Sequence, residues 1–316
     1  MSHGHACRLA RPLAPLLVIL LLLAISACGS RQAPPAPAAV DEEFALTSHA
    51  AGTAFGKGAY ARAADLYRQA LARAYARDDR GAIVDTQCNL AMVLLRLGAL
   101  EEARAAVDDA KAELARAEQG VPAHLLLLEA TVLYRTGQMA AACDINEQLL
   151  AGAAEAESGV MTKAQFLRGL LAAERGDEER LREAIAAIEK ANDPTLRGDH
   201  AELRGYLAMA ERHWDDAVQA FDTTAELRRE SLDYISMIWV LAKAGDASER
   251  RGRQRAAAVY YLRAGRSAAQ LGWQPEAVHW LMRAQLLARQ AGDAHTLQAV
   301  LDHLARLQER ELGQGR

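Results

Sequence analysis

The chain contains 316 residues, which is enough for about two ordinary domains or one elongated array. Hydrophobic residues make up 51% of the sequence but aromatic residues only 5%. An apolar content built mainly on alanine and leucine favours helices over sheets. The 37 basic and 41 acidic residues give a net charge of −4, which argues against a nucleic-acid-binding surface based on net charge. Four cysteines are too few for a disulfide framework.

The first 27 residues have the pattern of a secretory leader. Arg8 and Arg11 provide a positive start, and residues 16–27 form a largely apolar run. A run of this length is shorter than the roughly 20 residues that a membrane-spanning helix needs, but it is typical of a signal-peptide core. Residues 25–28 read Ile-Ser-Ala-Cys. This sequence resembles the bacterial lipobox, in which an aliphatic residue and two small residues precede a cysteine.

The resemblance to bacterial lipoproteins implies that residues 1–27 are a signal peptide and that Cys28 carries covalent acyl groups such as palmitate. Gly29 stands where an aspartate would imply retention in the inner membrane. The resemblance therefore implies an anchor in the outer membrane of a Gram-negative cell, with the protein facing the periplasm. Residues 28–43 would hold the lipidated cysteine and a Pro/Ala-rich tether. An ordinary signal peptide followed by a chance cysteine is the alternative.

The rest of the chain repeats one pattern at intervals of 36 to 40 residues. Each copy has a predicted turn, a large residue two positions later in most copies, a small or aliphatic residue at the fifth position, and mostly bulky residues at the ninth and twelfth. The turn positions are Gly58, Gly98, Gly137, Gly176, Arg212, Gly252 and Gly292. In six of the seven copies a second small residue, such as Ala91 or Gly205, stands seven residues before the turn.

This pattern resembles the tetratricopeptide repeat (TPR), a pair of antiparallel helices whose small residues allow close helix contact. The glycine suits the left-handed residue that ends the first helix. The intervals exceed the typical TPR length of about 34 residues, which implies longer helices or junctions. The resemblance predicts an all-α, right-handed superhelix of about seven hairpins in a repeat domain at residues 44–316. A single helical globule with irregular helices is the alternative.

The prolines and acidic pairs agree with this arrangement. Pro122, Pro194 and Pro275 each lie just before the predicted first helix of a repeat. Proline is tolerated there, whereas inside a helix it costs about 3 kcal/mol. Acidic residues at 101–102, 177–179 and 215–216 fall at the start of predicted second helices. Carboxylates there offset the positive helix terminus, so we interpret them as helix-stabilising groups and not as catalytic pairs.

Few residues suggest catalysis or metal binding. The histidines after residue 28 are scattered without metal-ligand spacing, and no Ser/His/Asp set can be assembled. We therefore expect no metal, no cofactor other than the lipid on Cys28, and no enzymatic activity. The periplasm is oxidising, so a disulfide between Cys88 and Cys143 must be considered. The helices that carry these two cysteines are not expected to be neighbours, and two free thiols are the preferred interpretation.

The TPR resemblance points instead to a binding groove, because in that family the first helices line a concave face. The predicted groove residues are Asn89, Arg96, Tyr134, Arg135, Phe166, Tyr206, Trp239, Arg250 and Arg283. Asn89 is either a clamp for a peptide backbone or a polar residue in an inter-helix bond. The aromatic residues are either anchors for a partner or ordinary packing residues.

These observations predict a lipid-anchored periplasmic scaffold or adaptor that binds a protein or peptide partner. The resemblance extends to scaffolds of secretion and pilus systems, murein-hydrolase adaptors and polysaccharide-export proteins, but only in architecture. The alternatives are a non-catalytic regulatory superhelix of a murein-modifying system and a passive structural spacer.

Overall fold

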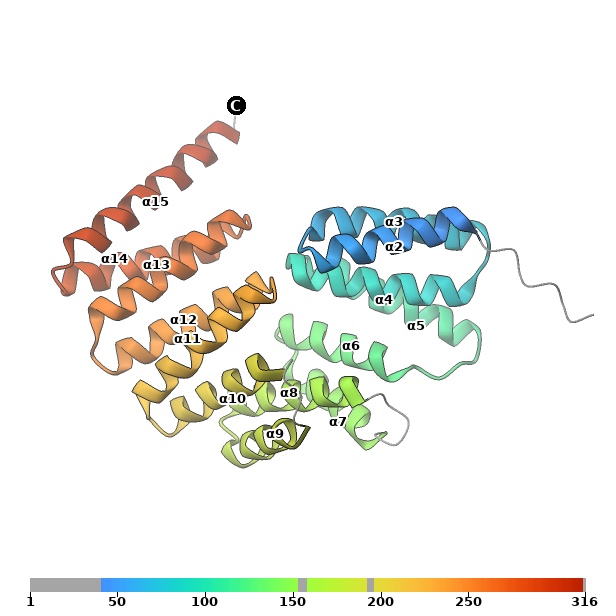
Figure 1. Cartoon of the computed structure of the whole chain (residues 1–316), viewed down its shortest axis with the longest axis horizontal. Coiled ribbons are helices and arrows are strands. Elements are labelled where there is room, and N and C mark those ends of the chain that lie inside the picture. The colour runs from blue at the N-terminus through green and yellow to red at the C-terminus, as the bar shows by residue number, and fades with distance from the viewer. Residues whose placement is uncertain (1–40, 153–157, 192–195, 315–316) are drawn as a thin grey trace, which may run out of the picture. The chain divides into compact units, whose positions relative to one another are not determined.

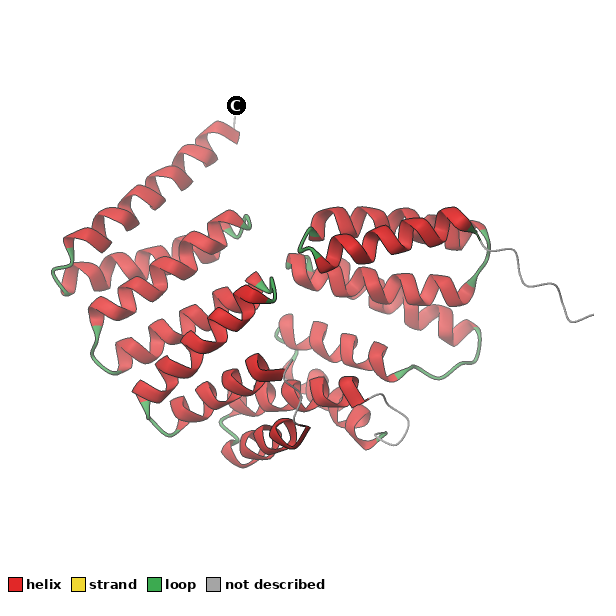
Figure 2. Ribbon diagram, viewed as in Figure 1, coloured by secondary structure: helices red, strands yellow, loops and turns green. Residues whose placement is uncertain are grey.

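The computed structural model describes residues 41–152, 158–191 and 196–314. Within these residues the chain forms fourteen α-helices and no strands. Figures 1 and 2 show how the helices are arranged. The helices are α2 (Glu42–Gly56), α3 (Tyr60–Ala76), α4 (Arg80–Leu97), α5 (Leu100–Arg116), α6 (Ala123–Arg135), α7 (Met139–Ala151), α8 (Ser158–Arg175), α9 (Glu178–Ala191), α10 (Arg197–Ala210), α11 (Trp214–Glu230), α12 (Tyr234–Arg250), α13 (Gln254–Gln270), α14 (Gln274–Gln290) and α15 (Ala294–Gln314). The predicted leader, lipobox and most of the tether lie outside the described residues.

The chain divides into two units, Met1–Glu42 and Glu43–Arg316. In the second unit each helix from α3 onward packs against the next helix in sequence, and several also contact the next but one, such as α6 with α8 and α13 with α15. Helix α2 shares an apolar core with α3 and α4. The helices therefore form a stack of seven hairpins, from α2/α3 to α14/α15 (Figure 1). This arrangement confirms the predicted all-α solenoid of helical hairpins.

The predicted turn positions adopt the conformation that glycine favours. Six of the turn glycines have φ between 61° and 80°, which is the left-handed region. Arg212, the exception in the sequence pattern, takes the same conformation with φ of 60°. The repeat geometry therefore requires a left-handed residue at this position even where no glycine is present.

Close contact between the helices of a hairpin explains the second small residue of each repeat. An added Cβ at Gly205 would lie 2.7 Å from the ring of Phe221, the bulky residue at the ninth position of the same repeat. At Gly245 the corresponding distance to the ring of Tyr261 is 3.1 Å. Small and bulky residues thus fit together across these two hairpins, as the pattern predicted.

The prolines occupy positions where they cost little. Pro122 is the N-cap residue of α6, as expected. Pro275 is the second residue of α14, so this helix begins slightly earlier than predicted. Proline is tolerated there because the first N–H groups of a helix have no intrahelical acceptor. Pro194 lies outside the described residues.

Turns that are far apart in the sequence also touch one another. The Tyr60 hydroxyl donates a hydrogen bond to the Leu232 carbonyl oxygen over 2.8 Å. A Cβ added at Gly98 would lie 2.9 Å from the indole ring of Trp273. The turns of the first two repeats therefore contact the junctions before the sixth and seventh repeats.

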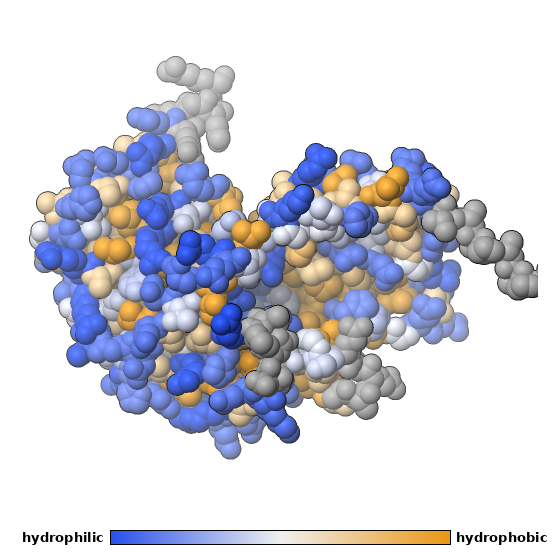
Figure 3. Space-filling model, viewed as in Figure 1, coloured by the Kyte–Doolittle hydropathy of each residue, from blue (hydrophilic) through white to orange (hydrophobic). Residues whose placement is uncertain are grey.

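The surface of the described helices carries both hydrophilic and apolar side chains. Hydrophilic side chains cover much of the face in Figure 3, with apolar side chains between them. The large exposed apolar residues include Leu46, Trp239, Val259, Met282 and Leu286. No helix within the described ranges is both long enough and apolar enough to cross a bilayer.

Candidate partner-binding site

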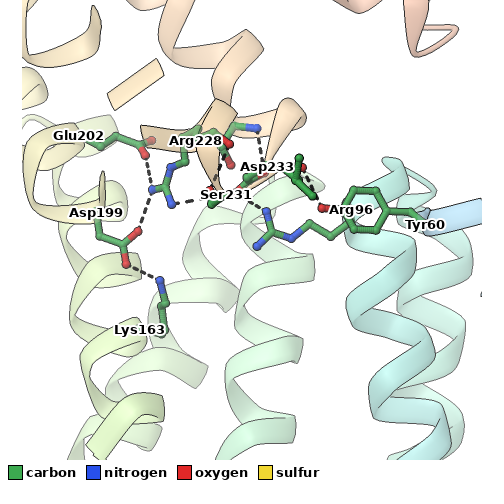
Figure 4. Close-up of polar contacts among 10 residues, drawn as sticks. Tyr60, Arg96, Lys163, Asp199, Glu202, Arg228, Ser231 and Asp233 are labelled. Carbon is green, nitrogen blue, oxygen red and sulfur yellow. Dashed lines mark hydrogen bonds and ion pairs between the residues drawn. The ribbon is translucent and has the colours of Figure 1, made fainter. Parts of the chain in front are cut away.

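Seven charged residues from five helices and one junction come together inside the second unit. This inner charge cluster consists of Arg96 (α4), Arg135 (α6), Lys163 (α8), Asp199 and Glu202 (α10), Arg228 (α11) and Asp233 (the N-cap of α12). Six of the seven are labelled in Figure 4. The first helices of the second to fifth repeats each contribute at least one residue, so the predicted inner faces do converge.

Arg228 lies at the centre of the inner charge cluster. Its Nη2 is 2.8 Å from Asp199 Oδ1 and 2.7 Å from Glu202 Oε2, and its Nη1 is 4.0 Å from Asp233 Oδ2. Its guanidinium also lies over the ring of Phe166, 5.5 Å from the ring centroid. Burial opposes the charge of Arg228, but the surrounding carboxylates outweigh burial and raise its pKa above the ordinary value.

Asp199 joins two cations that come from opposite sides. It accepts a hydrogen bond from Lys163 Nζ over 2.5 Å through one oxygen and pairs with Arg228 through the other. Glu202, one turn further along α10, pairs with Arg228 alone. Burial raises the pKa of Glu202, and the attraction of Arg228 offsets this only in part.

Asp233 has a local role and a long-range role. Its side chain accepts a hydrogen bond from the Ser236 backbone N–H and so caps the N-terminus of α12. It also forms an ion pair with Arg96, which lies in the last turn of α4. Burial opposes ionisation of Asp233, but the attraction of the positive charges of Arg96 and Arg228 is stronger, so the pKa of Asp233 is lowered.

Aromatic side chains border the inner charge cluster. Tyr134 and Tyr206 are largely buried, and this burial raises the pKa of both phenols. Tyr206 packs edge-on against Phe221, with ring centroids 5.3 Å apart. Lys243 Nζ lies 5.3 Å from the centroid of the Tyr206 ring. These contacts give Tyr206 a packing role beside any role in binding.

The structure brings together five of the nine predicted groove residues. These are Arg96, Tyr134, Arg135, Phe166 and Tyr206, which belong to the inner charge cluster or contact it electrostatically. Arg96 has the clearest electrostatic role of the five, because it forms an ion pair with Asp233 and lowers the pKa of that carboxyl.

The other predicted groove residues lie in other surroundings. Trp239 is 43% exposed and packs edge-on against Trp280, with centroids 5.2 Å apart. Asn89 is partly exposed on α4. Arg250 pairs with Asp246 of its own helix over 3.1 Å, and Arg283 Nε donates to Glu249 over 3.0 Å. Both arginines therefore take part in exposed ion pairs.

Five residues of the inner charge cluster are not among the nine predicted groove residues. Lys163, Asp199 and Glu202 lie on first helices, but Arg228 and Asp233 do not. Arg228 lies at the end of a second helix, and Asp233 lies in a junction, whereas the prediction considered only first helices. The sequence does mark Asp233 as a helix N-cap, because an aspartate directly before an apolar segment is a common helix-start pattern. Its pairing with Arg96 depends on how several repeats stack, and a repeat pattern does not encode that directly.

A small cavity lies beside the Arg96–Asp233 pair. It has a volume of about 70 Å³ and is lined by Tyr60, Arg96, Leu97, Asp233, Tyr234, Ile235 and Leu271. The lining combines apolar walls with two hydroxyls and the ion pair. Such a lining can accept a small group that has both apolar and polar parts.

The cysteines are separate from this site. Cys88 and Cys143 are free thiols, and burial raises the pKa of Cys88 to about 11. Arg175 Nη1 lies 3.1 Å from Cys143 Sγ. Within the described part of the chain, no group of three or more His, Cys, Asp or Glu side chains is arranged to hold a metal ion.

Comparisons with known proteins identify the fold. No protein-family model matches the chain, and no curated protein matches its sequence. Among solved structures, a Rap protein complexed with competence and sporulation factor aligns with a TM-score of 0.51 and 16% identity, over 79% of this chain and 76% of that one. The Rap conjugation gene regulator of plasmid pLS20, in complex with the Phr* peptide, aligns with a TM-score of 0.51 and 14% identity, over 95% and 87%.

A tetratricopeptide repeat protein from Parabacteroides merdae aligns with a TM-score of 0.45 and 16% identity, over 82% of this chain and 99% of that one. At these identities the likeness concerns the fold. The two Rap alignments therefore show that the chain shares the fold of those proteins, a stack of helical hairpins.

Proposed function

We propose that this protein is a non-catalytic adaptor that binds a protein or peptide partner against the inner faces of its first helices. One observation carries this proposal. Five of the nine residues selected from the sequence as groove residues come together at the inner charge cluster, from four consecutive first helices. Arginine and aromatic side chains gathered in this way are the residue types that dominate binding energies at interfaces.

The structural neighbours support this proposal. Two Rap structures of the same fold are described as complexes, one with competence and sporulation factor and one with the Phr* peptide. We infer a similar use of the fold here, with a partner of different sequence.

The test compares two apolar residues of matched exposure. Trp239 on the first helix α12 is 43% exposed, and Val259 on the second helix α13 is 40% exposed. After cross-linking in cells, Trp239→Ala should reduce recovery of the partner protein several-fold, whereas Val259→Ala should not. Equal recovery with both variants would count against the groove and would favour the structural-spacer alternative.

We further propose that Cys28 carries a lipid that anchors the protein in the outer membrane, where it faces the periplasm within a cell-envelope assembly. The lipobox-like residues 25–28 and the apolar run before them support this proposal. Several acyl chains would hold the protein effectively permanently, because each buried methylene contributes about 0.8 kcal/mol.

Radiolabelled palmitate tests the anchor. Cys28→Ser should abolish incorporation of the label and leave the protein either unprocessed or released from membranes, while Cys143→Ser should incorporate as much label as wild type. Gly29→Asp should move the protein to inner-membrane fractions. Incorporation that persists in Cys28→Ser would refute lipidation at this residue.

A further inference from the structure

A small cavity lies where the third hairpin packs against the fourth, and it shares no residue with the inner charge cluster. It has a volume of about 10 Å³, and its lining comes from α7, α8 and the start of α9. The polar residues of this lining include Cys143, Asn146, Arg168 and Arg175. A cavity of this size has room for about one oxygen atom.

One departure from the repeat pattern explains the polar character of the cavity. Asn146 occupies the ninth position of its repeat, where the fifth and sixth repeats carry Phe221 and Tyr261. Those two rings are buried in the core between hairpins. Asn146 is shorter than either ring and is polar, so the third repeat has space and hydrogen-bonding groups where other repeats have an apolar side chain.

Asn146 has an acceptor that no other group uses. Its side chain is 99% buried, because its exposed fraction is only 1%. Its Nδ2 donates a hydrogen bond to the Ala164 carbonyl oxygen over 3.1 Å, but its Oδ1 has no hydrogen-bond partner in the described part of the chain. The buried Nε of Arg168 also lacks a hydrogen bond there, although it lies 3.4 Å from Glu147 Oε1. An unused acceptor and an unused donor beside one small space suit a hydroxyl group, which can donate and accept.

Cys143 provides the atom to which such a hydroxyl group can be attached. Its thiol is partly exposed, and Arg175 Nη1 lies 3.1 Å from its Sγ. Within the described ranges no carboxylate lies within ion-pair distance of Arg175, so the charge of this guanidinium acts on the sulfur. Reactive cysteines occur in electropositive, partly exposed surroundings of this kind. Cys88 is the opposite case, because it is buried and burial raises the pKa of its thiol to about 11.

We propose that Cys143 is a redox-modification site, which hydroperoxides such as hydrogen peroxide oxidise to a sulfenic acid whose added oxygen is held in the cavity. The sulfur attacks one peroxide oxygen, so that an S–O bond forms and the O–O bond breaks. The sulfur loses two electrons and the peroxide gains them. The thiol proton passes to the departing hydroxide, which leaves as water.

The lining accounts for the stability of this product. The new S–OH group can donate to Asn146 Oδ1 and accept a charge-assisted hydrogen bond from Arg175. Cys143 and Asn146 belong to α7, whereas Arg175 is the last residue of α8. Oxidation therefore adds a polar contact between the third and fourth hairpins. This inference is independent of the proposed adaptor function.

A trapping experiment on the full chain tests the modification. The protein is treated with a small molar excess of hydrogen peroxide, and dimedone then captures sulfenic acids. Mass spectrometry of the separate peptides that carry Cys143 and Cys88 locates the label. We expect several-fold more label on Cys143 than on Cys88. Dithiothreitol added before dimedone should abolish the label, because a sulfenic acid is reversed by thiols whereas higher oxidation states are not.

Variants test the two groups that hold the oxygen. Arg175→Gln should slow the oxidation of Cys143 several-fold, because the positive charge beside the sulfur is lost. Arg116→Gln, which also replaces an exposed residue at the end of a helix, should leave the rate unchanged. Asn146→Leu gives the third repeat an apolar residue at its ninth position and should lower the yield of trapped sulfenic acid several-fold.

The melting temperature provides a readout that needs no variant. The oxidised wild type should melt at or above the temperature of the reduced protein, because the added oxygen finds hydrogen-bond partners. A Tm several degrees lower would show that the cavity does not hold the oxygen. Equal labelling of Cys143 and Cys88, a disulfide-linked dimer in place of the label, or an unchanged oxidation rate in Arg175→Gln would also overturn the proposal.

Discussion

Arg96, in the last turn of α4, forms an ion pair with Asp233, the residue that caps the N-terminus of α12. The pair joins the second repeat to the sixth, although the two residues are far apart in sequence. Asp233 is almost completely buried, with 5% exposure, and it also lies 4.0 Å from Arg228. Its carboxylate therefore links the stacking of the repeats to the inner charge cluster.

A double-mutant cycle should measure this link. We expect Arg96→Ala and Asp233→Asn to be non-additive in urea unfolding, with a coupling energy of about 0.5–3 kcal/mol. Asp233→Ala should be less stable than Asp233→Asn by about 1 kcal/mol, because only asparagine keeps the helix cap. The exposed pair of Arg104 and Asp108 should couple by no more than about 0.5 kcal/mol. Additive effects at Arg96 and Asp233 would show that the pair contributes nothing.

The pH dependence of stability should have two opposing contributions. The lowered pKa of Asp233 means that its contribution is present above the unfolded value of about 3.9 and is lost as the pH falls through the folded value. Glu202 acts in the opposite direction, because its pKa is raised in the folded protein. Its contribution to stability is present below about pH 4.3 and is lost as the pH rises through the pKa of the folded state.

Melting curves at a series of pH values test these signs. Asp233→Asn should flatten the loss of stability in acid, and Glu202→Gln should flatten the loss above about pH 4.3. Parallel profiles for wild type and Glu202→Gln would contradict the raised pKa.

Arg212 is a site where glycine should stabilise the protein. It is exposed and has φ of 60°, a conformation that costs a residue with a Cβ about 1–2 kcal/mol. Arg212→Gly should therefore raise the free energy of unfolding by about 1 kcal/mol. The control is Arg204→Gly on the exposed face of α10, which should lower it by a similar amount. A loss of stability in Arg212→Gly would mean that the arginine side chain makes a contribution of its own.

Gly205 and Gly52 should respond to alanine in opposite directions. At Gly205 the added methyl would lie 2.7 Å from the Phe221 ring, and such overpacking costs about 1–3 kcal/mol. At Gly52, in the middle of α2, its nearest neighbour would be the Tyr67 hydroxyl at an ordinary 3.7 Å. Gly52→Ala should therefore stabilise the protein by about 0.5–1 kcal/mol through helix propensity. Equal effects in chemical denaturation would argue against the close crossing at Gly205.

Features that depend on adjacent helices could be predicted from the sequence. The turn at Gly98 and the small residue at Gly205 each reflect one contact within a single hairpin, and the repeat pattern records such contacts directly. The interval of 36 residues before Arg212 did not obscure the pattern, because the geometry of the turn was kept there.

The inner charge cluster could be predicted only in part. Arg96 and Arg135 were selected because they lie on first helices, but Arg228 and Asp233 were not. The contact between Arg96 and Asp233 depends on the small rotations between successive hairpins, which accumulate over four repeats. Those rotations arise from packing details at every junction, so the residues that finally meet cannot be read from any single repeat.

The hydrogen bond from Tyr60 to the Leu232 carbonyl oxygen changes how the molecule can unfold. In a linear repeat array each unit contacts only its neighbours, so a terminal unit can fray while the others stay folded. Here the first hairpin is held by the junction before the sixth repeat, and Trp273 contacts Gly98 in the same way. Such contacts raise the contact order and slow folding. They also couple distant hairpins energetically. The first hairpin, although it lies near one end of the array, is therefore stabilised against local unfolding.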